Sequence, residues 1–91
     1  MDYTVYILTC ADGTYYTGIA RDPARRAEEH NGASGKGARY TASRRPVAIV
    51  YHAVFASRSE ALREEIRIKR LTRQQKADLI AAFARSAVTA S

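Results

Sequence analysis

The feature that most constrains the fold of this chain is a glycine-containing turn, Asp12-Gly13, between two stretches rich in tyrosine and β-branched residues. Residues 3–10 and 14–19 have the composition of β-strands, and a turn this short joins them as a hairpin. A shift of one residue in the pairing would move every side chain to the opposite face of the sheet. The length of the loop therefore decides which tyrosines lie on the same face.

A two-residue loop pairs Tyr6 with Ile19 and places the second tyrosine, Tyr16, on the opposite face. A three-residue loop, with Gly13 in a left-handed conformation, pairs Tyr6 with Gly18 and places Tyr6 and Tyr16 on one face. We favour the three-residue loop, because the missing side chain at Gly18 leaves room beside Tyr6.

The hairpin is followed by a segment with clear helix boundaries. Asp22 is a good N-cap, Pro23 suits the first helical position, and Asn31-Gly32 is typical of a left-handed C-terminal cap. Arg26 and His30 are four residues apart, so we expect both side chains on one face of this helix.

The second half of the chain predicts one more strand and two helices. Residues 46–55 form a near-continuous apolar run, typical of a buried central strand. Ser57 with Glu60, and Thr72 with Gln75, have the spacing of capping boxes and predict helices from residue 57 to about Lys69 and from residue 72 onward. The inner face of the last helix is expected to consist of Leu79, Ile80 and Phe83.

One carboxylate of the first of these helices stands out. The helical period places the apolar side chains on one side, with Glu65 near its middle and Glu64 and Glu60 well off it. A carboxylate inside an apolar stripe needs a cation, a partner or a metal. The residues that define this apolar side are Ala61, Leu62, Ile66 and Ile68.

These elements predict a small α/β (α+β) domain of order β-β-α-β-α-α. We expect a three-stranded, mostly antiparallel sheet flanked by helices, with the residue 46–55 strand in the centre. Residues 1–85 form one domain, and residues 86–91 are expected to be a frayed tail. The single cysteine, Cys10, excludes a disulfide framework within one chain and fits a reducing cytoplasm, and no secretory or membrane-spanning pattern is present.

The charge distribution points to nucleic acid. The net charge is +6, and no acidic residue occurs between Glu29 and Glu60. Basic side chains that neutralise phosphates release condensed counterions, so a one-sided basic stretch favours binding to DNA or RNA. A basic, solvent-exposed loop is the alternative explanation. The side chains expected to contact the DNA strand are Lys36, Arg39, Arg44 and Arg45.

The ordered motifs resemble the GIY-YIG nuclease family over residues 3 to about 80. The first half-motif matches Thr4-Val5-Tyr6, with threonine where glycine is often found, and the second matches Tyr16-Thr17-Gly18. Arg26, His30 and a helix carrying a glutamate follow in the same order. Residues 23–46 also resemble the nuclease domain of the Slx-type structure-specific endonuclease subunit, and the whole chain is similar to the small single-domain bacterial branch of the family.

The resemblance implies metal-dependent hydrolysis of phosphodiester bonds in DNA, selective for branched or single-stranded structure, in repair or recombination. Glu65 is the expected ligand of Mg²⁺ or Mn²⁺, and Arg26 the cation that stabilises phosphoryl oxygens. Tyr6, Tyr16 and His30 remain alternatives for the group that activates or positions water. Gly18 has a structural place in the motif.

Other interpretations stay open at this stage. Glu65 can be a structural partner of Lys69 or Arg26, Glu64 is the adjacent candidate ligand, and His30 can interact with its helix dipole. A non-catalytic nucleic-acid-binding module on the same fold is the second functional hypothesis, and a protein-interaction domain that uses the alanine-rich last helix is the third. A protein partner or a homodimer is also left open.

Overall fold

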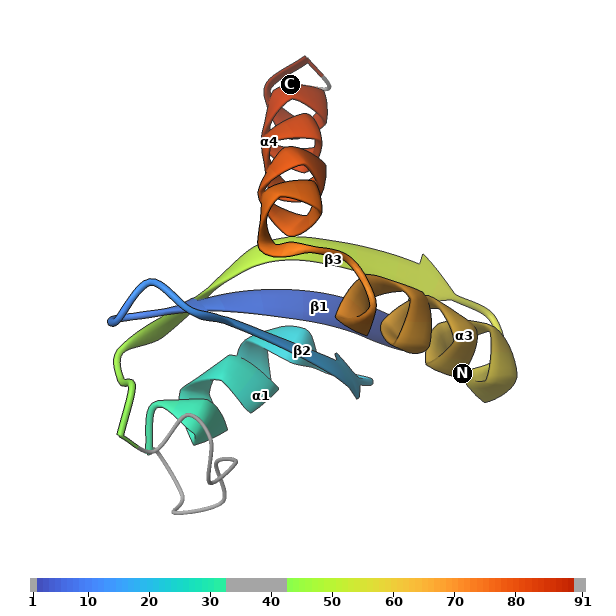
Figure 1. Cartoon of the computed structure of the whole chain (residues 1–91). Coiled ribbons are helices and arrows are strands. Elements are labelled where there is room, and N and C mark those ends of the chain that lie inside the picture. Colours follow the sequence, from blue (N-terminus) through green and yellow to red (C-terminus); the bar gives the residue numbers. More distant parts are fainter. Residues whose placement is uncertain (1, 33–42, 90–91) are drawn as a thin grey trace.

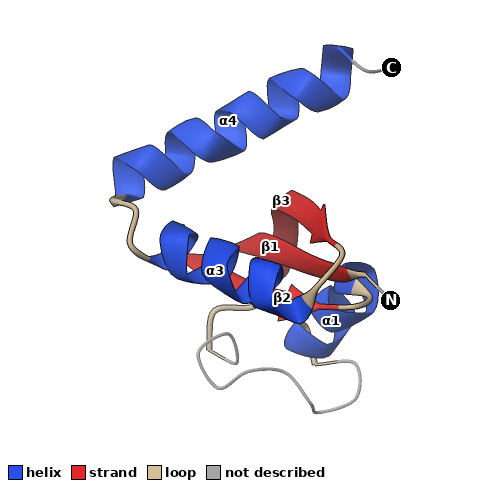
Figure 2. Ribbon diagram, turned by 90° about the vertical axis from the view of Figure 1, so that its right-hand side faces the viewer, coloured by secondary structure: helices blue, strands red, loops and turns tan. Residues whose placement is uncertain are grey.

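The computed structural model describes residues 2–32 and 43–89 and contains three strands and three helices in these ranges. In chain order they are β1 (Tyr3–Cys10), β2 (Tyr15–Ala20), α1 (Pro23–His30), β3 (Val47–Phe55), α3 (Arg58–Lys69) and α4 (Arg73–Thr89). This order confirms the predicted β-β-α-β-α-α arrangement. Figures 1 and 2 show α1 and α4 on opposite sides of the sheet, with α3 alongside β2.

The central strand of the sheet is β1, so the prediction that residues 46–55 form the central strand was wrong. The strand order is β2-β1-β3, and both pairs are antiparallel. Consecutive side chains of β1 are buried on both faces, whereas exposure alternates along β3, where Val54 is 57% exposed. An apolar composition shows that a strand packs well, but the pairing partners determine whether it lies at an edge.

The hairpin has the predicted register. Tyr6 pairs with Gly18 and Leu8 with Tyr16. The turn is closed by a hydrogen bond of 2.8 Å from the Cys10 N–H to the Thr14 carbonyl, and Gly13 has a φ of 84°. A side chain is disfavoured at this φ, so glycine at this position fixes the three-residue loop and with it the common face of the two tyrosines.

Two apolar clusters lie on the two faces of β1. Val5 and Ile7 pack with Tyr51, Ala61 and Ile68 beneath α3 and α4, and the predicted inner residues of α4 lie against this cluster. On the opposite face, the buried cluster consists of Tyr6, Leu8, Cys10 and Val47, with Tyr16 and Ala27 of α1 packed against it. Tyr6 of β1 and Tyr16 of β2 thus lie on the face of the sheet that α1 covers.

Local hydrogen bonds explain where the helices begin. The Asp22 side chain accepts from the Arg25 N–H at the start of α1, and the Ser57 hydroxyl accepts from the Glu60 N–H at the start of α3. At the start of α4, Thr72 and Gln75 form the reciprocal capping box.

The end of α1 combines a glycine turn with a link to the sheet. Gly32 is left-handed, with a φ of 97°, as predicted for the C-terminal cap. The Asn31 side chain bonds both the N–H and the carbonyl of Val47, at 2.7 and 3.0 Å. Asn31 therefore ties α1 to the beginning of β3.

The apolar side expected for α3 differs from the structure. Ile66 is 48% exposed, and the buried side of α3 consists of Ala61 and Ile68 with both Glu64 and Glu65 half-buried between them. The side of α3 that faces the sheet includes Glu64, because the Tyr51 hydroxyl of β3 donates to its carboxylate at 3.4 Å. Helix α4 continues to Thr89, past the residue 85 boundary; the frayed tail stays a prediction.

None of the helices in the described part of the chain has the combined length and apolar character needed to cross a membrane.

Candidate active site

Tyr6 forms the floor of the site beneath Gly18. The Tyr6 side chain is 1% exposed, and a Cβ atom added at Gly18 would lie 2.6 Å from its hydroxyl oxygen and 2.8 Å from Cζ. The same Cβ would lie 3.3 Å from Cε1 of Tyr16. Glycine is therefore required at this position by close approach of the two tyrosine rings, which confirms the room that the sequence predicted beside Tyr6.

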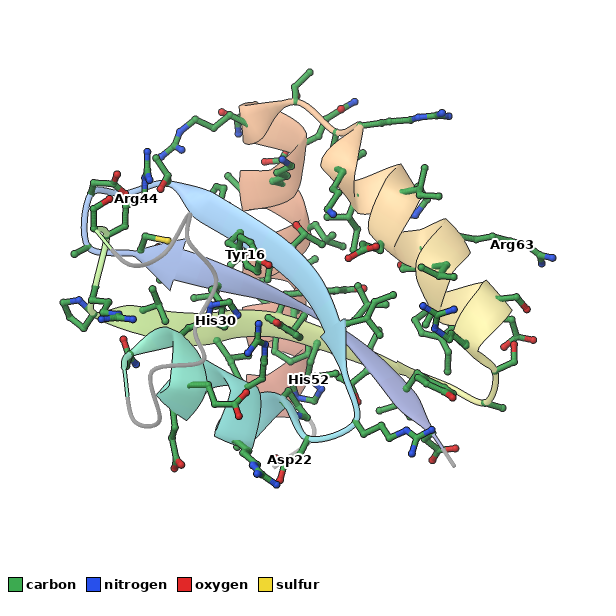
Figure 3. All side chains as sticks on the ribbon, turned by 90° about the horizontal axis from the view of Figure 1, so that it is seen from below. Tyr16, Asp22, His30, Arg44, His52 and Arg63 are labelled. Carbon is green, nitrogen blue, oxygen red and sulfur yellow. The ribbon has the colours of Figure 1, made fainter. Side chains whose placement is uncertain are left out.

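His30 lies behind the two tyrosines. It is fully buried, its Nε2 lies 3.2 Å from the Tyr6 hydroxyl, and its ring meets the Tyr16 ring edge-on with centroids 4.9 Å apart. Figure 3 shows Tyr16 and His30 approaching each other from β2 and α1. Burial, and next the positive charge of Arg26, lower the pKa of His30, which favours the neutral imidazole at neutral pH.

Arg26 extends from α1 to the same hydroxyl. Its Nη1 donates to Oε1 of Glu29 at 2.9 Å, and its guanidinium acts electrostatically on Tyr6. Burial raises the pKa of Tyr6 to about 12; the neighbouring Tyr16 adds to this, and the Arg26 charge opposes it. The Tyr6 phenol is therefore neutral at physiological pH, and its hydroxyl is held by His30.

The two adjacent glutamates of α3 have equal exposure but different surroundings. The side chains of Glu64 and Glu65 are both 17% exposed. Glu64 accepts from the Tyr51 hydroxyl at 3.4 Å and pairs with Arg67, which lowers the pKa of the Glu64 carboxyl. The helical period predicted that Glu65 would be buried more than Glu64, but the two carboxylates are equally buried. Their contacts separate them.

Glu65 lies on the tyrosine side. It acts electrostatically on Tyr6 and lines the pocket that contains both tyrosines and Arg26. Its carboxylate is 3.4 Å from Nζ of Lys69, which is the structural pairing that the sequence left open. An ion pair with a half-exposed lysine contributes only about 0–1 kcal/mol, so it does not explain why a carboxylate occupies this position.

A pocket of about 460 Å³ connects these residues; we call it the tyrosine pocket. Five predicted site residues line it, namely Tyr6, Tyr16, Gly18, Arg26 and Glu65. The other lining residues were not predicted from the sequence; they are Tyr3, Ile19, Ala20, Arg21, Arg58 and Leu62. A signal for part of this group was present, because Arg58, Leu62 and Glu65 have i, i+4, i+7 spacing and hence share a helix face.

The donor set suits a hydrated hard cation. Residues 2–32 and 43–89 contain no group of three or more histidine, cysteine, aspartate or glutamate side chains arranged to hold a metal. A single carboxylate completed by water oxygens is a common way for proteins to bind magnesium. Glu65 in the tyrosine pocket fits this chemistry.

The predicted DNA-contacting residues fall into two groups. Lys36 and Arg39 lie outside the described residues. Arg44 pairs with Asp12 at 3.0 Å across the β1–β2 turn, and the Arg45 Nε donates to the His30 carbonyl at 2.7 Å, at the end of α1. Both arginines therefore have structural partners, and their contact with DNA stays a prediction.

Comparison with known proteins identifies the family. The model of the GIY-YIG catalytic domain matches residues 2–78. The chain belongs to the GIY-YIG family. Within the matched range, β1 and β2 place Tyr6 and Tyr16 together against His30.

Its relatives with similar sequences include bacterial proteins named UPF0213. The chain is 55% identical over 78 residues to the UPF0213 protein DP2720 of Desulfotalea psychrophila, covering 86% of this chain and 70% of that protein. It is 51% identical over 76 residues to a UPF0213 protein of Staphylococcus aureus, covering 84% and 90%.

Solved structures show the same fold. The UPF0213 protein BH0048 from Bacillus halodurans is 45% identical, with a TM-score of 0.58 over 90% of this chain and 85% of that one. The protein EF2693 from E. faecalis is 43% identical, with a TM-score of 0.63 over 92% and 88%. The β-β-α-β-α-α architecture of a GIY-YIG domain is thus shared with structures of related sequence.

Proposed function

We propose that this protein is a metal-dependent endonuclease that hydrolyses DNA phosphodiester bonds, with selectivity for DNA structure rather than sequence. The observation that carries the proposal is the tyrosine pocket, in which a carboxylate from α3, an arginine from α1 and tyrosines from two strands line one cavity. A protein that only binds nucleic acid has no need for a half-buried carboxylate among phosphate-binding groups, because the carboxylate repels the phosphate.

In this proposal, each side chain has a separate task. Glu65 would hold Mg²⁺ or Mn²⁺, which when bound supplies Lewis-acid stabilisation of the leaving oxygen. The planar guanidinium of Arg26 binds the phosphoryl oxygens, where negative charge builds up. Glu29 supports this role, since its bond to Nη1 of Arg26 fixes the direction of the side chain.

The proposed reaction is hydrolysis by water. The water oxygen forms a bond to phosphorus, the bond from phosphorus to a sugar oxygen breaks, and that oxygen ends protonated. Tyr6 positions the attacking water through its hydroxyl. His30 is a positioning residue, because it does not line the tyrosine pocket as Tyr6 does, while its Nε2 holds the Tyr6 hydroxyl. Tyr16, which is half-buried above His30, is the other tyrosine able to contact the water.

The biological context belongs to the same proposal. Cleavage of branched or single-stranded DNA fits repair or recombination, in the cytoplasm that the single cysteine favours. The basic composition of the chain supports nucleic acid as substrate. A protein partner or a second copy remains a prediction from the sequence.

The two glutamates of α3 provide a matched test. Labelled branched and single-stranded DNA would be incubated with the wild-type chain, Glu65→Gln and Glu64→Gln, in magnesium and in manganese. We expect Glu65→Gln to lower the cleavage rate at least about 100-fold, because it removes the metal ligand. Glu64→Gln should cleave at the wild-type rate and lose less than about 1 kcal/mol of stability with its ion pair to Arg67.

Equal loss of cleavage in the two variants would contradict the assignment of Glu65. Salt-sensitive DNA binding by the wild type without cleavage in either metal would instead support a non-catalytic binding module on the same fold.

A further inference from the structure

The tyrosine pocket extends beyond the residues that the proposed reaction uses. One wall is a single face of α3, where Arg58, Leu62 and Glu65 follow one another at helical spacing. Seven residues of helix span about 10 Å, so Arg58 and Glu65 mark opposite ends of this wall. The pocket is therefore a short groove with Glu65 at one end and Arg58 at the other.

The opposite wall, formed by β2, also has an arginine at the Arg58 end of the groove. Gly18 lies over Tyr6 at the Glu65 end, and Arg21 follows β2 three residues later, about 10 Å along the strand direction. The Arg21 side chain is held at this end by Tyr3, because its Nη2 donates to the Tyr3 hydroxyl at 3.1 Å and its guanidinium lies 5.2 Å from the ring centre. Tyr3 thus holds Arg21 at the same end of the groove as Arg58.

Arg58 is well suited to bind a ligand. Its side chain is exposed at the pocket rim, and it has no ion pair with any residue in the described ranges. Glu65 is the sole acidic residue among the described residues that line the groove, against three arginines. The side chains between the two charged ends are apolar, chiefly Ile19 and Leu62.

We propose that Arg21 and Arg58 form a second phosphate subsite, which binds the phosphate next to the scissile one on the cleaved strand. The inference rests on the proposed endonuclease function. The intervening nucleoside lies against Ile19 and Leu62, since an apolar segment between two basic ends matches the alternation of nucleosides and phosphates along a strand. A volume of about 460 Å³ accommodates a nucleotide-sized ligand, in the range of about 300–1,000 Å³ usual for such sites.

This subsite gives a physical reason for selectivity towards irregular DNA. A nucleoside that enters the groove cannot remain stacked and paired in a duplex, and unstacking costs a few kcal/mol in paired DNA but much less in a single strand. The protein should therefore favour a flap, a gap or a frayed end at the position next to the cleaved bond.

A binding experiment tests the subsite without requiring cleavage. The affinity of a fluorescent single-stranded oligonucleotide would be measured by anisotropy over a salt series, with Glu65→Gln as the parent chain so that the DNA stays intact. Arg58→Ala and Arg21→Ala would be compared with Arg63→Ala, an exposed arginine on the same helix that points away from the sheet in Figure 3.

We expect each of the two groove variants to weaken binding about three- to tenfold at low ionic strength. Each should also reduce the slope of log affinity against log salt by about 0.7, the value for one lost phosphate contact on a single strand. Arg63→Ala should change both quantities much less. Equal effects of Arg58→Ala and Arg63→Ala would overturn the proposal, because they would indicate diffuse attraction to a basic surface.

A modified strand identifies the phosphate. A single uncharged methylphosphonate placed at successive positions near the junction of a flap substrate should weaken binding by the parent chain at the position next to the bond that the wild type cleaves. That effect should vanish in the Arg21→Ala, Arg58→Ala double variant, and its persistence there would overturn the subsite. Cleavage of the same strand by the wild type is measured separately. Cleavage without the expected binding pattern would refute the subsite alone, whereas the binding pattern without cleavage would refute the nuclease function alone.

Discussion

Substitution of Gly18 by alanine tests the closest contact in the site. The added Cβ would lie 2.6 Å from the Tyr6 hydroxyl and 2.8 Å from Cζ, whereas unstrained contacts between such atoms are about 3.5–4.0 Å. The Tyr6 ring would have to move by about 1 Å, but it is 1% exposed and its hydroxyl is bonded to His30. The structure therefore predicts a clash that a buried ring cannot escape at low cost.

The size of the effect follows from three contributions. Overpacking of a well-packed core costs about 1–3 kcal/mol, and a weakened buried hydrogen bond costs about 0.5–1.5 kcal/mol. Alanine regains about 0.5–1 kcal/mol, because glycine loses more backbone freedom when a strand forms. We expect Gly18→Ala to lower the free energy of unfolding by about 0.5–4 kcal/mol, or about 4–8 °C in Tm for each kcal/mol.

A double-mutant cycle isolates the cause. Urea unfolding would be measured for the wild type, Gly18→Ala, Tyr6→Phe and the double variant. Tyr6→Phe removes the hydroxyl, which is the nearest atom, so Gly18→Ala should cost about 1 kcal/mol less in that background. Gly13→Ala is the matched control, since its cost comes from a φ of 84° in the turn and should not depend on Tyr6.

Two results would refute this reasoning. A Gly18→Ala variant as stable as the wild type, or more stable, would show that the clash is relieved at no cost. An equal cost in the tyrosine and phenylalanine backgrounds would show that the Tyr6 hydroxyl is not the obstacle.

Three further predictions concern the same site. Because the pKa of His30 is lowered in the folded state, its stabilising effect is present above the unfolded pKa of about 6.5 and is lost as the pH falls below it; the free energy of unfolding should drop between pH 7.5 and 5 in the wild type, and less in His30→Gln. Because the pKa of Tyr6 is raised to about 12, the stability it contributes is present below pH about 10 and is lost as the pH rises towards 12; Tyr6→Phe should flatten the alkaline part of the stability curve, and an unchanged curve would contradict the burial of the phenol. Arg26→Lys keeps the positive charge but loses the planar fork, so single-turnover cleavage should slow about 100-fold with little change in Tm, and a wild-type rate would rule out bidentate contact with the phosphate.

Much of the local structure followed from the sequence because it depends on residues close together in the chain. Gly13 and the three-residue loop set the hairpin register, and that register placed Tyr6 beneath Gly18. The caps at Asp22 and Ser57 fixed the helix starts through side-chain bonds to N–H groups three residues away. Hydrogen bonds of such short range are nearly independent of the rest of the fold, so the residue pattern predicts them.

The tertiary structure alone decided how distant elements meet. The apolar run of residues 47–55 favoured a central strand, yet β1 is central because it pairs with strands on both sides. Glu64 and Glu65 are equally buried, and only the packing of α3 directs one to Tyr51 and the other to the tyrosine pocket. Contacts across a groove depend on where whole helices and strands lie. The spacing of residues along the chain does not specify these positions.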